Sequence, residues 1–260
     1  MYNNSFTNQP RHLVLVDVGN SAIKLGVANL DTGVVNRFKS CVSLAECHDY
    51  LKNTTAKQIF YSSVRPGFEI KSLCADLPYK IVSAQPFIGL EKLFFLESLD
   101  IGIDRKLACI AANQIVAQPF LVITMGTATS LSLVSGNSCS FSVIWPGLNL
   151  AVNAINSNTR IKVNSVFDSI TTPNKTVSIQ DSVNLGVLFS TLFSIESWVN
   201  HISQIQNTLL NVVITGGHSR LISRHLNINH LTEPELTIKG LLKLLGHKEV
   251  QEKLKVTNNK

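Results

Sequence analysis

The sequence predicts an α/β protein that consists of two halves with the same order of elements. In each half, three short strand patterns are separated by tight turns, and strand and helix patterns then alternate. Closely spaced strands favour antiparallel pairing, whereas strands that alternate with helices favour parallel pairing. We therefore predict two domains, at residues 1–117 and 118–260, with a ligand in the cleft between them.

The first half opens on an apolar, β-branched segment at residues 12–16, followed by strand patterns at 22–29 and 34–38. Residues 44–51 have helical spacing and follow Ser43, a residue type that favours helix N-caps. The remaining elements predicted for this half are strands at 58–61 and 79–82, a helix from Pro66-Gly67 to Leu73, a loop at 85–89, and a helix at 104–116.

The second half repeats the opening, with strand patterns at residues 120–123, 129–134 and 141–145. Pro146-Gly147 then opens a helix, and the polar segment at 156–180 is predicted to be a loop or a mobile flap. The elements predicted to follow are a long helix at 187–201, a strand at 211–214, a helix that reaches about residue 225, and an amphipathic helix at 236–245.

Composition excludes several classes of protein. Of the 260 residues, 45% are hydrophobic and 15% are charged, which excludes a disordered chain. The net charge of +6 suits a site that receives anionic phosphates. It does not by itself call for a nucleic-acid partner, and we expect none. Five cysteines without a CxxC pair favour a reduced, cytoplasmic setting, and no run approaches the roughly 20 apolar residues of a membrane span.

Residues 17–24, DVGNSAIK, combine the groups that a phosphate site needs. The segment lacks the glycine pattern of a P-loop and of a Rossmann fingerprint. Instead it offers turn amides and the Lys24 ammonium for a polyphosphate, and the Asp17 carboxylate for Mg²⁺. A strand-ending turn with Lys24 in solvent is the alternative interpretation.

Two further glycine turns follow strand patterns in the second half. Met125-Gly126-Thr127 occupies the place that corresponds to the first turn, so that two facing turns could clamp one phosphate chain. Thr215-Gly216-Gly217 has open amides that could admit a nucleotide base or sugar, although it could equally be a plain helix entry.

The segment Gly102-Ile103-Asp104-Arg105 places an acid and a base side by side at the start of a helix. Asp104 could accept a proton from a substrate hydroxyl, and Arg105 could bind a carboxylate or a phosphate. The pattern alone favours the alternative, in which Asp104 is an N-cap and Arg105 lies at the surface.

Five motifs, taken in order, resemble those of one family. DVGNSAIK resembles the DxGNTxxK motif of the type III pantothenate kinases, GIDR resembles their GADR motif, and MGTAT resembles their DxGTAT motif. IWPG and ITGG resemble the end of the GGxIxPG motif and the TGG motif of the same family. The resemblance covers about residues 12–246.

The resemblance implies two duplicated RNase H-like domains around a nucleotide cleft, the fold of the acetate and sugar kinases, Hsp70 and actin-like ATPases. It also implies transfer of the γ-phosphate of ATP to the 4′-hydroxyl of pantothenate, the first step of coenzyme A biosynthesis. The expected cofactors are ATP, Mg²⁺ and a monovalent cation, K⁺ or NH₄⁺, and the expected assembly is a homodimer.

The resemblance also implies roles for individual residues. Asp104 would be the general base, and Asp17 would engage Mg²⁺ through water. The residues implied to contact ATP are Asp17, Val18, Gly19, Asn20, Ser21, Ala22, Ile23, Lys24, Gly126, Thr127, Gly216 and Gly217. Those implied to contact pantothenate are Phe95, Gly102, Ile103, Asp104, Arg105 and Ile179.

The sequence departs from the family pattern at several positions. Thr124 stands where the family has the aspartate that binds the monovalent cation, and Phe95 stands where it has a substrate-contacting tyrosine. Phe141 and Ser142 replace paired glycines, and Ile179 falls near a substrate-contacting threonine. These changes predict weakened K⁺ activation. They leave two alternatives open: a catalytically impaired nucleotide-binding homologue with a regulatory or transcription-accessory role, and a kinase with another acceptor.

Overall fold

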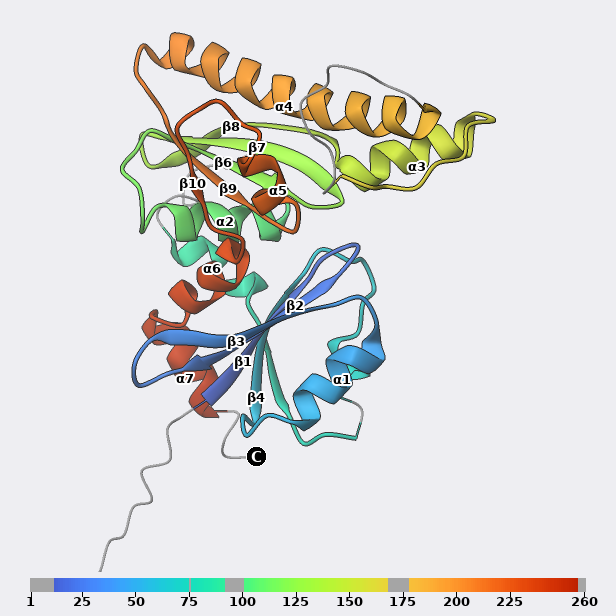
Figure 1. Ribbon diagram of the computed structural model, residues 1–260. Coiled ribbons are helices and arrows are strands. Elements are labelled where there is room, and N and C mark those ends of the chain that lie inside the picture. The colour runs from blue at the N-terminus through green and yellow to red at the C-terminus, as the bar shows by residue number, and fades with distance from the viewer. Residues whose placement is uncertain (1–11, 75, 92–100, 168–177, 257–260) are drawn as a thin grey trace, which may run out of the picture. The chain divides into compact units, whose positions relative to one another are not determined.

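The computed structural model describes residues 12–74, 76–91, 101–167 and 178–256 (Figure 1). By its internal contacts the chain divides into two compact units. The first unit comprises residues 1–90 and 237–260, and the second comprises residues 91–236. Residue 117, the predicted boundary between the two domains, lies in sequence between the strands of the first sheet and those of the second. The predicted domain bounds, 1–117 and 118–260, stay a prediction.

The first unit contains a five-stranded sheet of order β3-β2-β1-β4-β5. β1 pairs with β2 antiparallel and with β4 parallel, so β1 is the central strand. Leu13 to Val18 are buried, as expected for a strand that is covered on both faces. The strands are β1 (His12–Val18), β2 (Ile23–Asn29), β3 (Val34–Cys41), β4 (Gln58–Ser63) and β5 (Lys80–Ser83).

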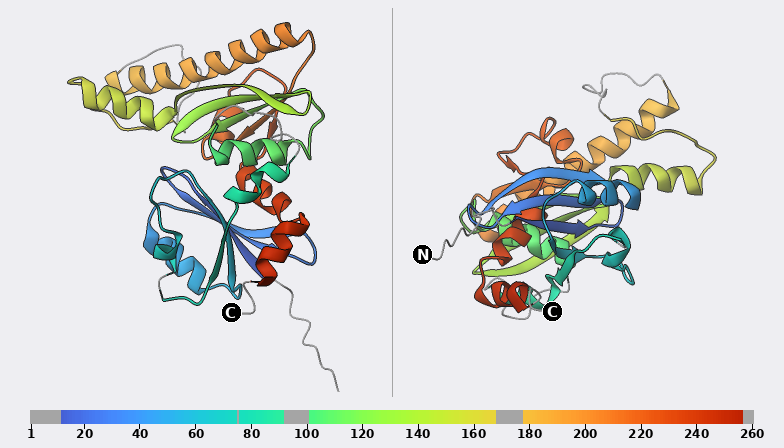
Figure 2. Two further views of the ribbon diagram at one scale, coloured as in Figure 1. Left: turned by 180° about the vertical axis from the view of Figure 1, so that it is seen from behind. Right: turned by 90° about the horizontal axis from the view of Figure 1, so that it is seen from below.

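Helices cover both faces of this sheet (Figure 2). Helix α1 (Leu44–Lys52) packs on the face that carries Val14, Val16 and Val18. Ser43 Oγ caps its start by accepting from the Glu46 N–H, and Glu46 Oε2 accepts from the N–H of Val42, the residue before the N-cap.

The other face of the first sheet packs against the C-terminal segment of the chain. This segment forms α6 (Leu236–Leu244) and α7 (Lys248–Val256). A Cβ atom at Gly26 would lie 3.1 Å from Ile238 Cγ2, and Gln58 Nε2 donates to the Leu254 carbonyl at 3.1 Å. Residues far apart in sequence therefore complete the first unit.

The second unit contains a sheet of order β10-β9-β6-β7-β8. Read from the opposite edge, as β8-β7-β6-β9-β10, it has the same strand order as the first sheet. β6 is central and pairs with β7 antiparallel and with β9 parallel. The strands are β6 (Phe120–Met125), β7 (Ala128–Ser135), β8 (Ser138–Pro146), β9 (Asn211–Thr215) and β10 (Leu231–Thr232). The repeated strand order, with its matching parallel and antiparallel pairs, confirms the predicted fold class of two RNase H-like domains.

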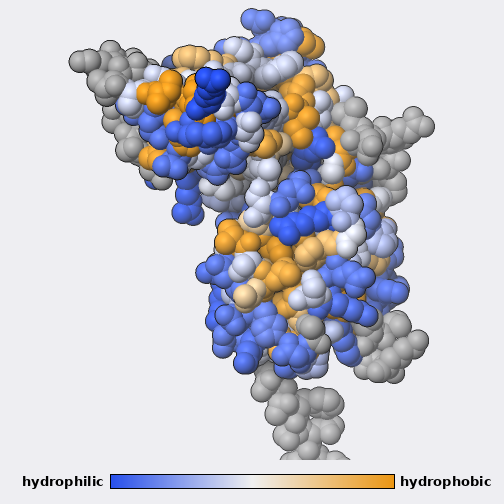
Figure 3. All heavy atoms as spheres, turned by 90° about the vertical axis from the view of Figure 1, so that its right-hand side faces the viewer, coloured by the Kyte–Doolittle hydropathy of each residue, from blue (hydrophilic) through white to orange (hydrophobic). Residues whose placement is uncertain are grey.

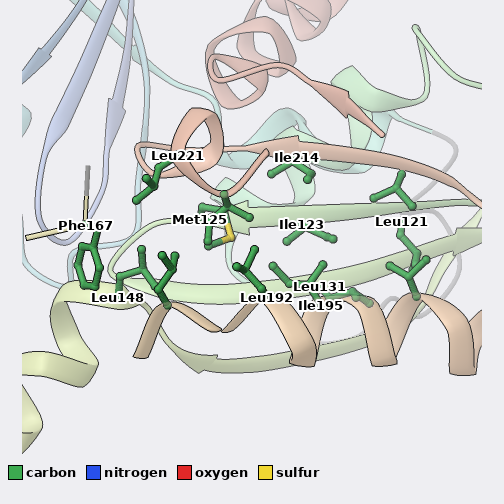
Figure 4. Close-up of a cluster of buried hydrophobic side chains, with 14 of the residues drawn as sticks. Leu121, Ile123, Met125, Leu131, Leu148, Phe167, Leu192, Ile195, Ile214 and Leu221 are labelled. Atoms are coloured by element: carbon green, nitrogen blue, oxygen red, sulfur yellow. The ribbon is translucent and has the colours of Figure 1, made fainter. Parts of the chain in front are cut away.

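Leu121, Ile123 and Met125 of β6 point into the main core of the second unit, where they meet α4 side chains such as Leu192 and Ile195 (Figure 4). Four helices belong to this unit by sequence position: α2 (Ile103–Ala112), α3 (Leu148–Asn158), α4 (Ile179–Gln206) and α5 (Ser219–Ser223). By length and composition alone α4 could cross a membrane, but its buried side chains belong to this core.

Several predicted elements differ in extent or type. The helix predicted to reach Leu73 is a short 3₁₀ segment, η1 (Ile70–Leu73), and the loop predicted at 85–89 is a second one, η2 (Gln85–Leu90). The long helix begins at Ile179 rather than at residue 187, because Ser178 Oγ caps it by accepting from the Asp181 N–H. Part of the predicted 156–180 flap is therefore helical, and residues 168–177 lie outside the described residues.

We predict that Leu121→Ala lowers the free energy of unfolding of the second unit by about 2–5 kcal/mol, because Leu121 is fully buried in its core. Both tryptophans, Trp145 and Trp198, lie in this unit, so their fluorescence during denaturant unfolding reports on it. Leu209→Ala is the matched control, since Leu209 is 92% exposed and its truncation should change stability by less than about 0.5 kcal/mol. Equal transitions for both variants would contradict this packing.

Candidate active site

The predicted phosphate turn of the first unit closes the β1–β2 pair. Val18 and Ile23 are the last paired residues, so residues 19–22 form the turn. The Gly19 N–H donates to the Ala22 carbonyl at 3.1 Å, and Asn20 and Ser21 are exposed. A buried central strand thus ends in a short, accessible backbone turn.

Asp17 lies one residue before the end of β1 and is only 4% exposed. Its neighbours in register are Lys24 on β2 and Ser62 on β4. Ser62 Oγ donates to Asp17 Oδ1 at 3.0 Å, which holds the carboxylate in place. A single fixed carboxylate beside a phosphate turn fits Mg²⁺, which proteins commonly bind with one or two carboxylates together with substrate phosphates and water.

Arg65 also reaches this turn, although the sequence analysis did not single it out. Its Nε donates to the Gly19 carbonyl at 2.6 Å. Arg65 follows the end of β4, and parallel strands place their carboxyl ends at one edge of a sheet. The predicted parallel pairing of these strands could therefore have indicated that Arg65 lies near the turn.

The second unit has a turn of the same kind. Met125 pairs with Thr129, and the Gly126 N–H donates to the Ala128 carbonyl at 3.1 Å. Gly126 and Thr127 are exposed, whereas Met125 points into the core. The two predicted phosphate turns therefore share their hydrogen-bond pattern and their place after a central strand.

Two other glycines approach the second turn so closely that no side chain fits. A Cβ atom at Gly147 would lie 2.3 Å from the Gly126 carbonyl oxygen, and the Gly147 N–H donates to the Thr127 carbonyl at 3.0 Å. A Cβ atom at Gly216, whose φ is +97°, would lie 2.4 Å from the Met125 carbonyl oxygen. The segments MGTAT, IWPG and ITGG thus meet at one place, with Gly217 exposed beside them.

Thr124 occupies in β6 the position that Asp17 occupies in β1. Its register neighbours are Ser130 on β7 and Thr215 on β9. Thr215 Oγ1 donates to the Pro234 carbonyl at 3.1 Å, and Thr124 is half-buried. Where the first sheet carries a carboxylate, an ammonium and a hydroxyl, the second carries three neutral hydroxyls.

Asp104 lies in the first turn of α2 and is half-buried. Gly102 is the N-cap, with an extended ψ of 151°, so the interpretation of Asp104 as an N-cap is wrong. Ile103 is buried and directs the helix start toward the core, which leaves Gly102 and Asp104 more accessible. Among the described residues, the Asp104 carboxylate forms no hydrogen bond or ion pair, so it is available to accept a proton.

Arg105 is anchored to the sheet of the second unit. Its Nη1 donates to Ser142 Oγ at 3.3 Å, and Ser142 Oγ lies 3.1 Å from Ser132 Oγ. Nearby, the buried thiols of Cys109 and Cys139 share a hydrogen bond, which raises the pKa of Cys109 and lowers that of Cys139. The positive charge of Arg105 acts on both thiols in the lowering direction.

Two predicted substrate-binding residues are not brought to this site by the described structure. Ile179 is the first residue of α4 and is 58% exposed, while Phe95 lies outside the described residues. The second unit also has a cavity of about 500 Å³ between Trp145, Pro146 and residues of α3 and α4. None of the predicted site residues lines this cavity.

Within the described ranges, no three His, Cys, Asp or Glu side chains are grouped as they would be in a metal cage.

A family model described as type III pantothenate kinase matches residues 13–201 of this chain. The chain belongs to the type III pantothenate kinase family. The match spans the Asp17 turn, the Asp104 segment and the Gly126 turn.

Curated type III pantothenate kinases match nearly the whole chain. One from Sulfurihydrogenibium sp. (strain YO3AOP1) is 28% identical over 253 residues, covering 88% of this chain and 97% of the relative. Another from Acholeplasma laidlawii (strain PG-8A) is 27% identical over 245 residues, covering 89% and 97%. A crystal structure of a Baf family protein from Campylobacter jejuni has a TM-score of 0.55 at 17% identity, covering 90% and 97%. At that identity the likeness shows the fold alone.

Ser142, one of the predicted departures from the family pattern, lies on β8 within hydrogen-bonding distance of Arg105. The IWPG motif predicts that Ser142 replaces a glycine of the type III pantothenate kinase pattern, and the Ser142 hydroxyl accepts a hydrogen bond from Arg105 at 3.3 Å. A glycine could not supply this contact. The departure therefore alters the surroundings of a predicted substrate-binding residue.

We predict that Gly216→Ala destabilises the second unit by about 1–3 kcal/mol, because a methyl group would meet the Met125 backbone and φ is positive. Unfolding followed by tryptophan fluorescence measures the change. Gly186→Ala in α4 is the control: its Cβ meets nothing within 4 Å, and alanine should raise stability by up to about 1 kcal/mol. Unchanged stability of the Gly216→Ala variant would refute the close approach.

Proposed function

We propose that this chain is a kinase that transfers the γ-phosphate of ATP to the 4′-hydroxyl of pantothenate, giving 4′-phosphopantothenate in the first step of coenzyme A biosynthesis. Family membership supports the reaction class. The observation that carries the proposal is Asp104, a half-buried carboxylate without a hydrogen-bonding partner among the described residues, at the start of a helix. Such a group can accept the proton of an attacking hydroxyl.

The two glycine turns are assigned to the phosphates of ATP. The turn at the exposed residues Asn20 and Ser21, with the Lys24 ammonium, suits an anion, and Gly126 and Thr127 form the corresponding turn of the second unit. Gly216 and Gly217 are assigned to the nucleoside. Val18 and Ile23 close the first turn from buried positions, and Gly19 and Ala22 form its internal hydrogen bond.

Phosphoryl transfer depends chiefly on positioning and charge stabilisation. Mg²⁺, when bound, would neutralise charge on the phosphates, and Asp17 would hold it, directly or through water. Arg105 would bind the pantothenate carboxylate, since a guanidinium recognises carboxylates in a bidentate manner. Gly102 and Ile103 would line the same pocket.

We further propose that the protein acts as a homodimer in the cytoplasm. Large apolar side chains reach the surface of the second unit at Ile144, Leu150, Phe193 and Ile205, and apolar residues interrupt the hydrophilic surface in Figure 3. A self-association surface would cover such residues. The five free cysteines, all buried, suit a reducing compartment.

A catalytically impaired nucleotide-binding homologue remains the second candidate. Thr124 and Ser142 favour it, because both change positions at which the family pattern has an aspartate and a glycine. The measurement that separates the two functions is ADP release from Mg-ATP by the purified protein, with and without pantothenate. Release that depends on pantothenate supports the kinase, whereas ATP binding without release supports the alternative.

We predict that Asp104→Asn lowers the turnover number by about 10²–10⁴, because asparagine cannot accept the proton of the 4′-hydroxyl. Asp49→Asn, an exposed change on α1, should leave turnover unchanged. Pantothenate-dependent ADP release measures both. Near-normal turnover of the Asp104→Asn variant would remove Asp104 from the mechanism.

We predict that K⁺ changes the rate of ADP release only weakly. Thr124 offers a neutral hydroxyl, and a hydroxyl attracts a cation less strongly than a carboxylate does. Rates are compared with KCl and with choline chloride at one ionic strength, for the wild type and for Thr124→Asp. The variant should gain K⁺ dependence, and a clear K⁺ requirement of the wild type would contradict the prediction.

A further inference from the structure

We propose that Arg65 binds the nucleotide phosphates at the Asp17–Lys24 turn and orients the backbone of that turn, an inference that rests on the proposed use of ATP. Neither the motif pattern nor the resemblance assigns a role to this residue. Its assignment stands on its position, its hydrogen bond to the turn and its uncompensated charge.

The end of β4 brings Arg65 level with the turn. The Val64 N–H donates to the Val18 carbonyl at 3.1 Å, which continues the parallel β1–β4 pairing beyond Ser63. The backbone of Arg65 is then fixed by Ser63, whose Oγ accepts from the Arg65 N–H at 3.2 Å. A long side chain on this rigid segment reaches the turn with little loss of freedom on binding.

The hydrogen bond from Arg65 Nε to the Gly19 carbonyl orients the turn. At 2.6 Å it is short, as expected for a donor that carries a charge. In a trans peptide the N–H of the next residue points away from the carbonyl. Fixing the Gly19 carbonyl therefore fixes the direction of the N–H of Asn20, an exposed residue of the turn that is assigned to phosphate.

The rest of the guanidinium is available for a ligand. Arg65 is half-buried, and its guanidinium carbon lies 5.6 Å from the centre of the Phe68 ring. Within the described part of the chain, its side chain makes no ion pair and no hydrogen bond other than the one to Gly19. The two Nη groups keep the fork geometry that binds phosphate oxygens in pairs.

The charges around the turn favour a polyanion. Lys24 lies on β2 and Arg65 follows β4, so a cation stands on each side of the central strand β1, which carries Asp17 one residue before its end. Two positive charges and one negative charge leave a net positive turn. A nucleoside triphosphate gains from this excess through its phosphates, whereas a nucleoside does not.

The test compares the binding of Mg-ATP and of adenosine by titration calorimetry. We expect Arg65→Ala to weaken Mg-ATP binding by about 10–100-fold, the range for losing a hydrogen bond to a charged group, and to leave adenosine binding unchanged. Arg65→Lys should recover part of the loss, since it restores the charge without the planar fork. Raising the salt concentration should weaken Mg-ATP binding more in the wild type than in Arg65→Ala.

Lys57→Ala is the control, because Lys57 is exposed and precedes β4, whereas Arg65 follows the other end of this strand, whose six residues span about 20 Å. Its Mg-ATP affinity should equal that of the wild type. Thermal unfolding of each variant checks that it folds. Equal Mg-ATP affinity of Arg65→Ala and wild type, or equal losses for Mg-ATP and adenosine, would overturn the assignment.

The outcome is separable from the proposed function. If Mg-ATP binding depends on Arg65 but pantothenate does not stimulate ADP release, the proposed acceptor is wrong and the assignment of Arg65 stands. If the wild type phosphorylates pantothenate and Arg65→Ala binds Mg-ATP normally, only the assignment fails. Absence of Mg-ATP binding by the wild type would overturn both.

Discussion

Each half of the molecule is governed by one central strand that is covered on both faces yet ends in an exposed turn. β1 and β6 each pair with an antiparallel and a parallel neighbour, so three strand ends meet beside the turn. A buried strand tolerates polar side chains only where partners or solvent satisfy them. Asp17 and Thr124 each lie one residue before the end of their strand, close to solvent. Ser62 also satisfies Asp17 by donating a hydrogen bond to it.

The two turns share a backbone plan and differ in charge. The first is surrounded by Asp17, Lys24 and Arg65, whose charges do not cancel. The second has only hydroxyls beside Thr124, and its backbone is held by the close approach of Gly147 and Gly216. The same architecture thus carries charged side chains beside the turn of one unit and tight backbone packing beside the turn of the other.

Much of the fold was predictable because its signals are local. Apolar runs marked the central strands, and Ser43 marked the start of α1. Helix α7 was missed because only Val250 and Leu254 show its apolar spacing in a charged segment. Contacts between segments distant in sequence were also missed. The register of β1 and β4 sets the contact of Arg65 with Gly19, and the position of helix α2 beside strand β8 sets the contact of Ser142 with Arg105. No single sequence pattern encodes either contact.

The first unit is assembled from segments that precede and follow the second unit in sequence, and this affects its synthesis. Gly26 and Gln58 contact residues Ile238 and Leu254, which are synthesised after the whole of the second unit. Until helices α6 and α7 are made, nothing from that segment covers the sheet face that carries Leu15, which pairs with Gly26. The second unit is by then already complete in sequence. The nascent protein therefore passes through a stage with an exposed apolar sheet, the kind of surface that chaperones bind.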